Sequence, residues 1–224
     1  MIVPDEVIRS NRRTISISIM KNGAVVVKAP IKAKDDQINQ FVMAKQGWIQ
    51  SKVNACLLTN AKFKDIISYE KVLVYGNKYS ILLADTKKIE LGDGLQIIFP
   101  RKIAPEHRVK HLKIWFKKLA KRALEARIYQ IAEKLKFVFN SFKITDCKGR
   151  WGSCSSRKQI NINYKVIMLP PAVIDYILVH ELCHLAQMNH SKSFWKLVGA
   201  CYPNYSAAKN NLKQYSFLLD LYRK

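Results

Sequence analysis

The sequence predicts an α+β protein in which a β-rich amino-terminal region precedes a mainly helical carboxy-terminal region. Three observations carry this prediction. Short alternating apolar segments separated by turn residues fill much of residues 14–100. A long segment with apolar residues at every third or fourth position follows from about residue 109. A second apolar helix starts at Pro170-Pro171 and carries two histidines four residues apart. We expect two regions, 1–104 and 105–224.

The amino-terminal region begins with a predicted hairpin. Residues 14–19 alternate strictly, and residues 24–27 follow across Asn22-Gly23, which supplies the positive φ angles of a tight turn. Asp35 or Asp36 can then cap a helix that runs to about Leu57. A helix packed on a hairpin makes a small α+β unit.

Two further antiparallel hairpins are predicted between Lys71 and Pro100. Their turns are Gly76-Asn77 and Asp93-Gly94, and their strands are residues 72–75, 79–83, 89–91 and 95–99. The polar stretch from Pro100 to Pro105 separates these strands from the helical region, and this is the reason for the division after residue 104.

The long helical segment spans about residues 109–139. Its apolar face comprises Leu112, Trp115, Phe116, Leu119, Ala123, Leu124, Ile128, Ile131 and Leu135. A basic face carries Lys110, Lys113, Lys117, Lys118, Lys121 and Arg122. This basic face is either solvated or a surface that binds anions.

The segment His180-Glu181-Leu182-Cys183-His184 carries the clearest chemical signal. On a helix, His180 and His184 leave the same face one turn apart and can share a metal ion. Glu181 then lies beside the open position of the metal and can take a proton from bound water. Because the rest of the helix is apolar, two unliganded histidines on it would be costly to bury.

His190 is the predicted third metal ligand. Asn189 can adopt the left-handed conformation that ends a helix and directs the next residue back towards the metal. Three histidine nitrogens plus water form a catalytic zinc site with an open position. We therefore expect one zinc ion per chain, bound by His180, His184 and His190, with Glu181 as general base.

Further site residues come from the flanking segments. The loop Arg150-Trp151-Gly152-Ser153-Cys154 could place Arg150 near the metal, where it would bind a substrate anion or stabilise an oxyanion. The alternative is a packed loop in which Trp151 fills the core. After His190, Ser191 can cap a helix that walls the site with Phe194 and Trp195. Tyr202 or Tyr205 is a weaker candidate donor to a reaction intermediate.

Together these residues resemble the YgjP-like family of bacterial metal-dependent hydrolases, which are minimal zincins related to the SprT-like and WLM proteases. The resemblance rests on Arg150 to Ser155, Ile160 to Asn163, Pro170-Pro171, Tyr176, His180 to His184, Asn189-His190 and Phe194-Trp195, and it extends to Ile8 to Arg13 and Trp48-Ile49. It implies a minimal zincin in residues 105–224, with an active-site helix, a backing helix and a small antiparallel sheet. It also implies metal ligands at His180, His184 and His190.

The small sheet is expected in residues 142–164, beside the active-site helix. Residues 142–145 and 159–163 both alternate. Zincins commonly use an exposed strand edge to hold an extended peptide by main-chain hydrogen bonds. Ile160 to Asn163 is the predicted edge strand.

Composition limits the cellular setting and the partners. The net charge of +23 attracts polyanions, so nucleic acid or a nucleoside phosphate is a candidate partner through the basic surface. The five cysteines are scattered, which favours reduced thiols. The apolar runs are shorter than the roughly 20 residues of a membrane span, and the start lacks the layout of a signal peptide. We therefore expect a basic cytoplasmic protein with no membrane partner.

The favoured hypothesis is a zinc metallopeptidase that acts on a peptide or protein. Two alternatives stay open. The same site could cleave the phosphoanhydride of a nucleotide, which the positive charge favours. The chain could instead be a nucleic-acid-binding protein whose metal site is structural or degenerate, which a fourth protein ligand would favour.

Overall fold

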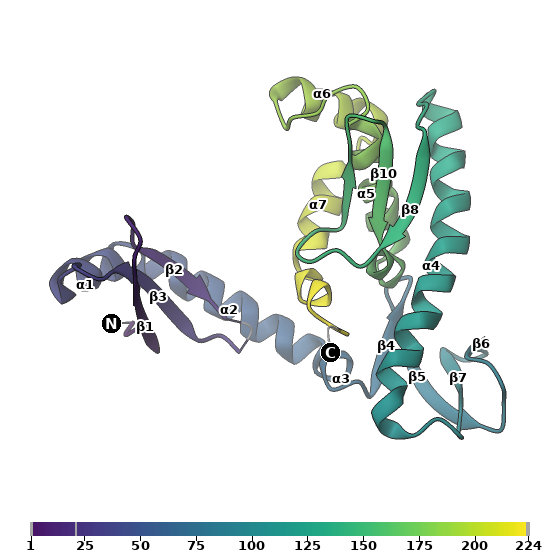
Figure 1. The fold of residues 1–224 in the computed structure, drawn as a ribbon, viewed down its shortest axis with the longest axis horizontal. Coiled ribbons are helices and arrows are strands. Elements are labelled where there is room, and N and C mark those ends of the chain that lie inside the picture. The colour runs from purple at the N-terminus through teal and green to yellow at the C-terminus, as the bar shows by residue number, and fades with distance from the viewer. Residues whose placement is uncertain (1, 21, 223–224) are drawn as a thin grey trace. The chain divides into compact units, whose positions relative to one another are not determined.

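A computed structural model describes residues 2–20 and 22–222 of the chain. It is a mixed α+β structure, as predicted, with three small sheets and both long and short helices within the described residues (Figure 1). The chain forms two compact units, one ending at Ile67 and one beginning at Ser68.

The sheet of the first unit contains the predicted hairpin and one added strand. Strands β2 (Ser16–Ile19) and β3 (Val25–Pro30) pair antiparallel. The Met20 N–H donates to the Ala24 carbonyl at 2.8 Å, which closes the hairpin as predicted. Strand β1 (Glu6–Ser10) pairs parallel with the other side of β3, so β3 is central.

The helical segment after this sheet is divided into three pieces, α1 (Asp35–Ala44), α2 (Gln46–Lys62) and α3 (Lys64–Ile67), of which α1 and α2 pack residues against the sheet. The prediction of one helix to Leu57 was wrong, because Lys45 leaves the helical conformation with φ −108° and ψ 7°. The cap also differs, since the Gln37 side chain accepts from the Lys34 N–H at 3.1 Å. The core of this unit consists of Val25, Val27, Ala29, Ile38, Val42 and Ile49.

The second unit begins with a four-stranded sheet of order β4-β5-β7-β6. Its strands are β4 (Lys71–Val74), β5 (Asn77–Ala84), β6 (Glu90–Gly92) and β7 (Gln96–Pro100). Both predicted hairpins are present and antiparallel. The central pair, β5 and β7, runs parallel.

The β4–β5 turn joins this sheet to the second half of the same unit. The Tyr75 and Gly76 N–H groups donate to the carbonyls of Ile167 and Met168 at 2.9 and 3.1 Å. A Cβ atom on Gly76, which has φ +81°, would lie 2.8 Å from the Pro170 ring, so only glycine fits there. The two compact units divide between residues 67 and 68, whereas the sequence predicted two regions that divide between residues 104 and 105. Where the catalytic domain begins stays a prediction.

The long helix α4 (Pro105–Leu135) starts four residues before the predicted position, with Pro105 in its first turn. It ends at Lys136, which has φ 58°, and so does not reach residue 139. Its buried stripe contains Leu112, Phe116, Ala120, Leu124, Ile128, Ile131 and Ala132.

Helix α4 lies alongside the third sheet, which contains β8 (Ser141–Thr145), β9 (Gly152–Cys154) and β10 (Gln159–Asn163) (Figure 1). The strand order is β8-β10-β9; β8 pairs parallel with β10, and β9 pairs antiparallel with it. The predicted antiparallel sheet is therefore mixed. The predicted edge strand, Ile160 to Asn163, is central, because the unpredicted β9 covers one of its sides.

The 3₁₀ helix Tyr164–Met168 is buried and leads into the helix α5 (Pro171–Cys183). Helices α6 (Lys192–Cys201) and α7 (Tyr205–Lys213) and the 3₁₀ turn Ser216–Leu219 complete the described chain. None of the helices in residues 2–20 and 22–222 combines the length and apolar character that a bilayer span requires.

Candidate active site

Helix α5 carries His180 and Glu181 in its last turns, and His184 follows directly at its end. The helix starts as predicted, with Pro170 before the first turn and Pro171 inside it. Its buried residues fix it in the core, so the two histidines project from a rigid element.

His190 comes back to the two helical histidines. Its Nε2 atom lies 3.0 Å from the His180 Nε2 atom. Ring nitrogens of all three histidines lie within 4.8 Å of one another, which is close enough to hold one metal ion. The predicted left-handed Asn189 is wrong, because its φ is not positive. Instead, the Asn189 side-chain oxygen accepts from the Ser191 N–H at 3.3 Å and shapes the turn.

Helix α6 packs two aromatic rings against the histidines, as predicted. Ser191 caps the helix by accepting from the Phe194 N–H at 3.4 Å. The buried Phe194 ring stacks on His184 at 4.5 Å between centroids and meets the edges of His180 and His190. The Trp195 ring stacks on His190 at 5.7 Å. These contacts hold the three imidazoles in place.

Hydrogen bonding fixes the tautomer of His184. Its Nδ1 atom lies 3.0 Å from the Gln187 carbonyl oxygen, which can only accept. The Nδ1 atom therefore carries the proton, and Nε2 keeps a lone pair for a metal. The Nδ1 atom of His180 is buried and has no partner among the described residues.

Burial favours the neutral form of the two histidines at the end of α5, His180 and His184. Burial, together with smaller contributions from His184, His190 and Lys209, lowers the pKa of His180 to about 3. Burial also lowers the pKa of His184, although the bond to Gln187 opposes this shift. Neutral imidazole is the form that binds metal, so this donor set fits a divalent ion such as zinc.

Glu181 is buried, with 6% of its surface exposed, and lies against β9. A Cβ atom on Gly152 would lie only 2.6 Å from Glu181 Oε1, so the carboxylate occupies space that any larger residue would fill. Burial raises the pKa of Glu181, the positive charge of Arg150 opposes this shift, and the net result is a pKa of about 8. A pKa close to neutral pH suits a group that has to accept a proton and then return it.

The loop that carries Arg150 is held by a fully buried amide. Asn163 donates from Nδ2 to the carbonyls of Cys147 and Arg150 at 2.9 and 3.2 Å. Its Oδ1 atom accepts from the Lys165 N–H at 3.1 Å. Main-chain positions of the loop are therefore fixed, while the Arg150 side chain itself is exposed.

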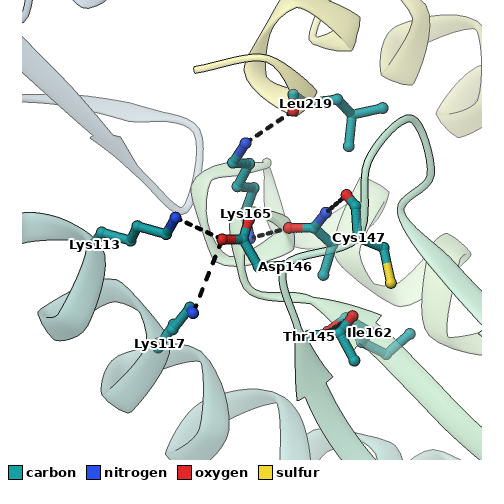
Figure 2. A network of polar contacts seen from close by, with 9 residues as sticks. Lys113, Lys117, Thr145, Asp146, Cys147, Ile162, Lys165 and Leu219 are labelled. Carbon is teal, nitrogen blue, oxygen red and sulfur yellow. Dashed lines mark hydrogen bonds and ion pairs between the residues drawn. The ribbon is translucent and has the colours of Figure 1, made fainter. Parts of the chain in front are cut away.

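Figure 2 shows how the same loop is tied to its surroundings. The Asp146 carboxylate forms ion pairs with Lys113 at 2.7 Å and Lys117 at 3.9 Å, both on α4. The buried Lys165 ammonium donates to the Leu219 carbonyl at 2.9 Å, which anchors the carboxy-terminal turn.

The two candidate tyrosines have different surroundings. The Tyr202 hydroxyl donates to the Ala172 carbonyl at 2.9 Å, near the start of α5 and away from its histidines. The Tyr205 ring stacks on Trp195 at 5.7 Å. Lys209 also lies over the Trp195 ring, at 3.7 Å, and so supports the aromatic layer under the histidines.

Sequence reasoning missed three contributors to the site. Gln187 acts through its main-chain carbonyl, for which no sequence signal exists. Gly152 leaves room for Glu181, a role that the residue type alone does not reveal. Asn163 ends an alternating strand, and a buried polar residue at that point is the signal that could have identified it.

Comparison with known proteins decides the family. A family model described as YgjP-like, metallopeptidase domain, matches residues 13–215. The chain belongs to this YgjP-like metallopeptidase family. It is therefore a metal-dependent hydrolase of the peptidase type, and its family implies a divalent metal.

Two crystal structures are also similar to parts of the chain. That of the metallopeptidase zymogen of Pyrococcus abyssi abylysin is 26% identical, with a TM-score of 0.38, over 43% of this chain and 95% of the other. That of the metallopeptidase zymogen of Methanocaldococcus jannaschii jannalysin is 19% identical, with a TM-score of 0.36, over 41% and 95%. The comparison with curated proteins gives no match.

Proposed function

We propose that the protein is a zinc peptidase that binds one zinc ion per chain through His180, His184 and His190. The observation that carries this proposal is the cluster of three histidine nitrogens within 4.8 Å, two of them from the helix that also carries the buried Glu181. Zinc suits neutral imidazole nitrogens, and such ligands in a tetrahedral site lie about 3.4 Å apart. The 3.0 Å between His180 Nε2 and His190 Nε2 is near this spacing.

The number of ligands favours a catalytic over a structural metal. Among the described residues, no fourth His, Cys, Asp or Glu joins the three histidines. Structural zinc sites are normally closed by four protein ligands, whereas catalytic sites leave one position for water or substrate.

Glu181 is the proposed general base and acid. A bound zinc ion would lower the pKa of a water molecule and polarise the scissile carbonyl. Glu181 accepts the proton of the attacking water and returns it to the leaving amine. Gly152 leaves the space that this carboxylate occupies. Arg150, whose charge already acts on Glu181, is the proposed partner for negative charge that develops on the substrate.

Strand β9 is the proposed binding edge for the peptide substrate. Trp151 and Ser155 both bond to β10, through Asn163 N–H to Trp151 C=O at 2.7 Å and Ser155 N–H to Gln159 C=O at 3.0 Å. Because bonded residues alternate along an antiparallel strand, Gly152 and Cys154 direct their N–H and C=O groups away from β10. These groups can pair with an extended peptide next to Glu181.

A comparison of wild type with Glu181→Gln tests this proposal. Both proteins, loaded with zinc to the same content, are incubated with a peptide library and with nucleoside triphosphates. We expect peptide cleavage by the wild type and a loss of at least about 100-fold in the variant, which keeps the shape of the side chain but cannot accept the proton. Equal cleavage by the variant would rule out Glu181 as base. Cleavage of nucleotides alone would rule out the peptidase.

A further inference from the structure

A groove lies between α4 and the outer edge of β8, in the second compact unit. Its volume is about 420 Å³, and it is lined by Lys117, Lys118, Lys121, Glu125, Phe142, Lys143 and Ile144. Helix α4 contributes one wall through residues spaced four apart, and β8 contributes the other.

The strand side of this groove is a sheet edge. Strand β8 is the outermost strand of its sheet, with β10 on its other side. Phe142, Lys143 and Ile144 are consecutive, and consecutive side chains of a strand point to opposite faces. A groove lined by all three therefore runs along the edge itself, where main-chain groups are available for pairing.

The charge of the groove is strongly positive. Four lysines and one glutamate line it. The Lys117 ammonium also forms an ion pair with the Asp146 carboxylate, at 3.9 Å. Lys118, Lys121 and Lys143 are exposed, and none of them takes part in an ion pair between described residues. Three lysine ammonium groups are thus free to pair with an incoming anion.

We propose that this groove is a docking site for an extended acidic peptide segment, which pairs with the β8 edge and places its carboxylates against Lys118, Lys121 and Lys143. An edge strand flanked by a helix is a common setting for binding a peptide as an added strand. The lysines supply the charge selectivity. A nucleic acid would match the charge, but it would not use the free main-chain groups of β8.

This site goes beyond the metal centre, and only its consequence for cleavage rests on the proposed peptidase function. If that function holds, the groove recruits substrates that carry an acidic segment. The experiment measures binding alone and uses Glu181→Gln, which does not cleave the probe. A failure of the docking site is therefore distinguishable from a failure of the peptidase.

The probe is a short fluorescent peptide rich in glutamate, and its binding is followed by polarisation. The triple variant Lys118→Glu, Lys121→Glu, Lys143→Glu is compared with Lys87→Glu, Lys102→Glu, Lys110→Glu, a control with the same change of net charge at exposed lysines outside the groove. We expect affinity to fall by about tenfold or more in the groove variant and by less than about threefold in the control.

Two modified probes separate the parts of the proposal. Replacing the glutamates by glutamine should weaken binding strongly, and methylating alternate main-chain nitrogens should weaken it as well, because strand pairing needs those N–H groups. Equal losses of affinity in both triple variants would mean that binding depends only on the overall charge of the protein, and would overturn the groove as the docking site. Unchanged binding of the methylated peptide would overturn strand pairing. Tighter binding of single-stranded DNA, sensitive to the same groove variant, would assign the groove to nucleic acid instead.

Discussion

At the scale of single residues, Gly152 sets the position of the proposed base. The replacement Gly152→Ala should displace the Glu181 carboxylate, because the added Cβ would lie 2.6 Å from Oε1. Since small misplacements of a reacting group are costly, we expect kcat/KM to fall by roughly 10- to 100-fold, with zinc content unchanged. Peptide hydrolysis and metal analysis on the same sample measure both quantities.

Gly47→Ala is the matched control for this variant. A Cβ atom at Gly47 meets nothing within 4 Å, and the residue lies in a helix of the other compact unit. The control should keep full activity. Full activity in Gly152→Ala as well would show that the carboxylate does not need this space.

At the residue scale, the sequence predicts the candidate metal ligands more readily than the contacts that hold them in place. The four-residue spacing of His180 and His184 on a helix is local information, and so is the nearby His190. Contacts made through the main chain, such as that of Gln187, depend on tertiary geometry and leave no mark on residue type. The roles of His180, His184 and His190 as metal ligands, and those of Glu181 and Arg150, stay predictions.

At the scale of elements, β10 organises the loop beside the site through Asn163. Asn163→Ala would leave the carbonyls of Cys147 and Arg150 and the Lys165 N–H without their partner. Because the Lys165 N–H is buried and the two bonds to the carbonyls are partly buried, we expect a loss of about 1–3 kcal/mol in the free energy of unfolding. Urea denaturation followed by circular dichroism measures this loss.

The control is Asn161→Ala, two residues earlier on the same strand. Its side chain is partly exposed and makes one long bond to Ser153 Oγ, at 3.4 Å. A change within about 0.5 kcal/mol is expected. If both variants lost the same stability, the buried amide would have no special role in holding the loop.

For the strands, the sequence predicts the hairpin pairs but not the parallel pairs. Turn residues such as Gly76 and Asp93-Gly94 specify antiparallel neighbours, and these hairpins were predicted. The parallel pairs β1–β3, β5–β7 and β8–β10 join strands that are distant in sequence, and no local turn specifies them. The short β9 pairs antiparallel with the next strand along the chain, but its residues, Gly152 to Cys154, include none of the β-branched or aromatic types typical of strands. It was therefore missed, and β10 was taken for the edge.

At the scale of the whole molecule, metal binding should couple to stability. An ion that binds only the folded protein stabilises it by mass action, by about 2.7 kcal/mol when its free concentration is 100 times its Kd. We expect zinc to raise the Tm of the wild type and a chelator to reverse the rise. Thermal unfolding with and without zinc measures the effect.

The variant His190→Ala should lose most of this zinc-dependent rise in Tm, because it removes one of the three proposed ligands. His107→Ala, at an exposed histidine near the start of α4, should keep it. An undiminished rise in His190→Ala would mean that the stabilising zinc binds elsewhere.

The most direct test of the account is the zinc content of protein purified without added metal. Elemental analysis of wild type, His190→Ala and His107→Ala compares the proposed ligand with a histidine outside the site. The account predicts close to one zinc ion per chain in the wild type and in His107→Ala, and a clear loss in His190→Ala. A wild type without bound metal, or a His190→Ala variant that keeps its zinc, would contradict the three-histidine site.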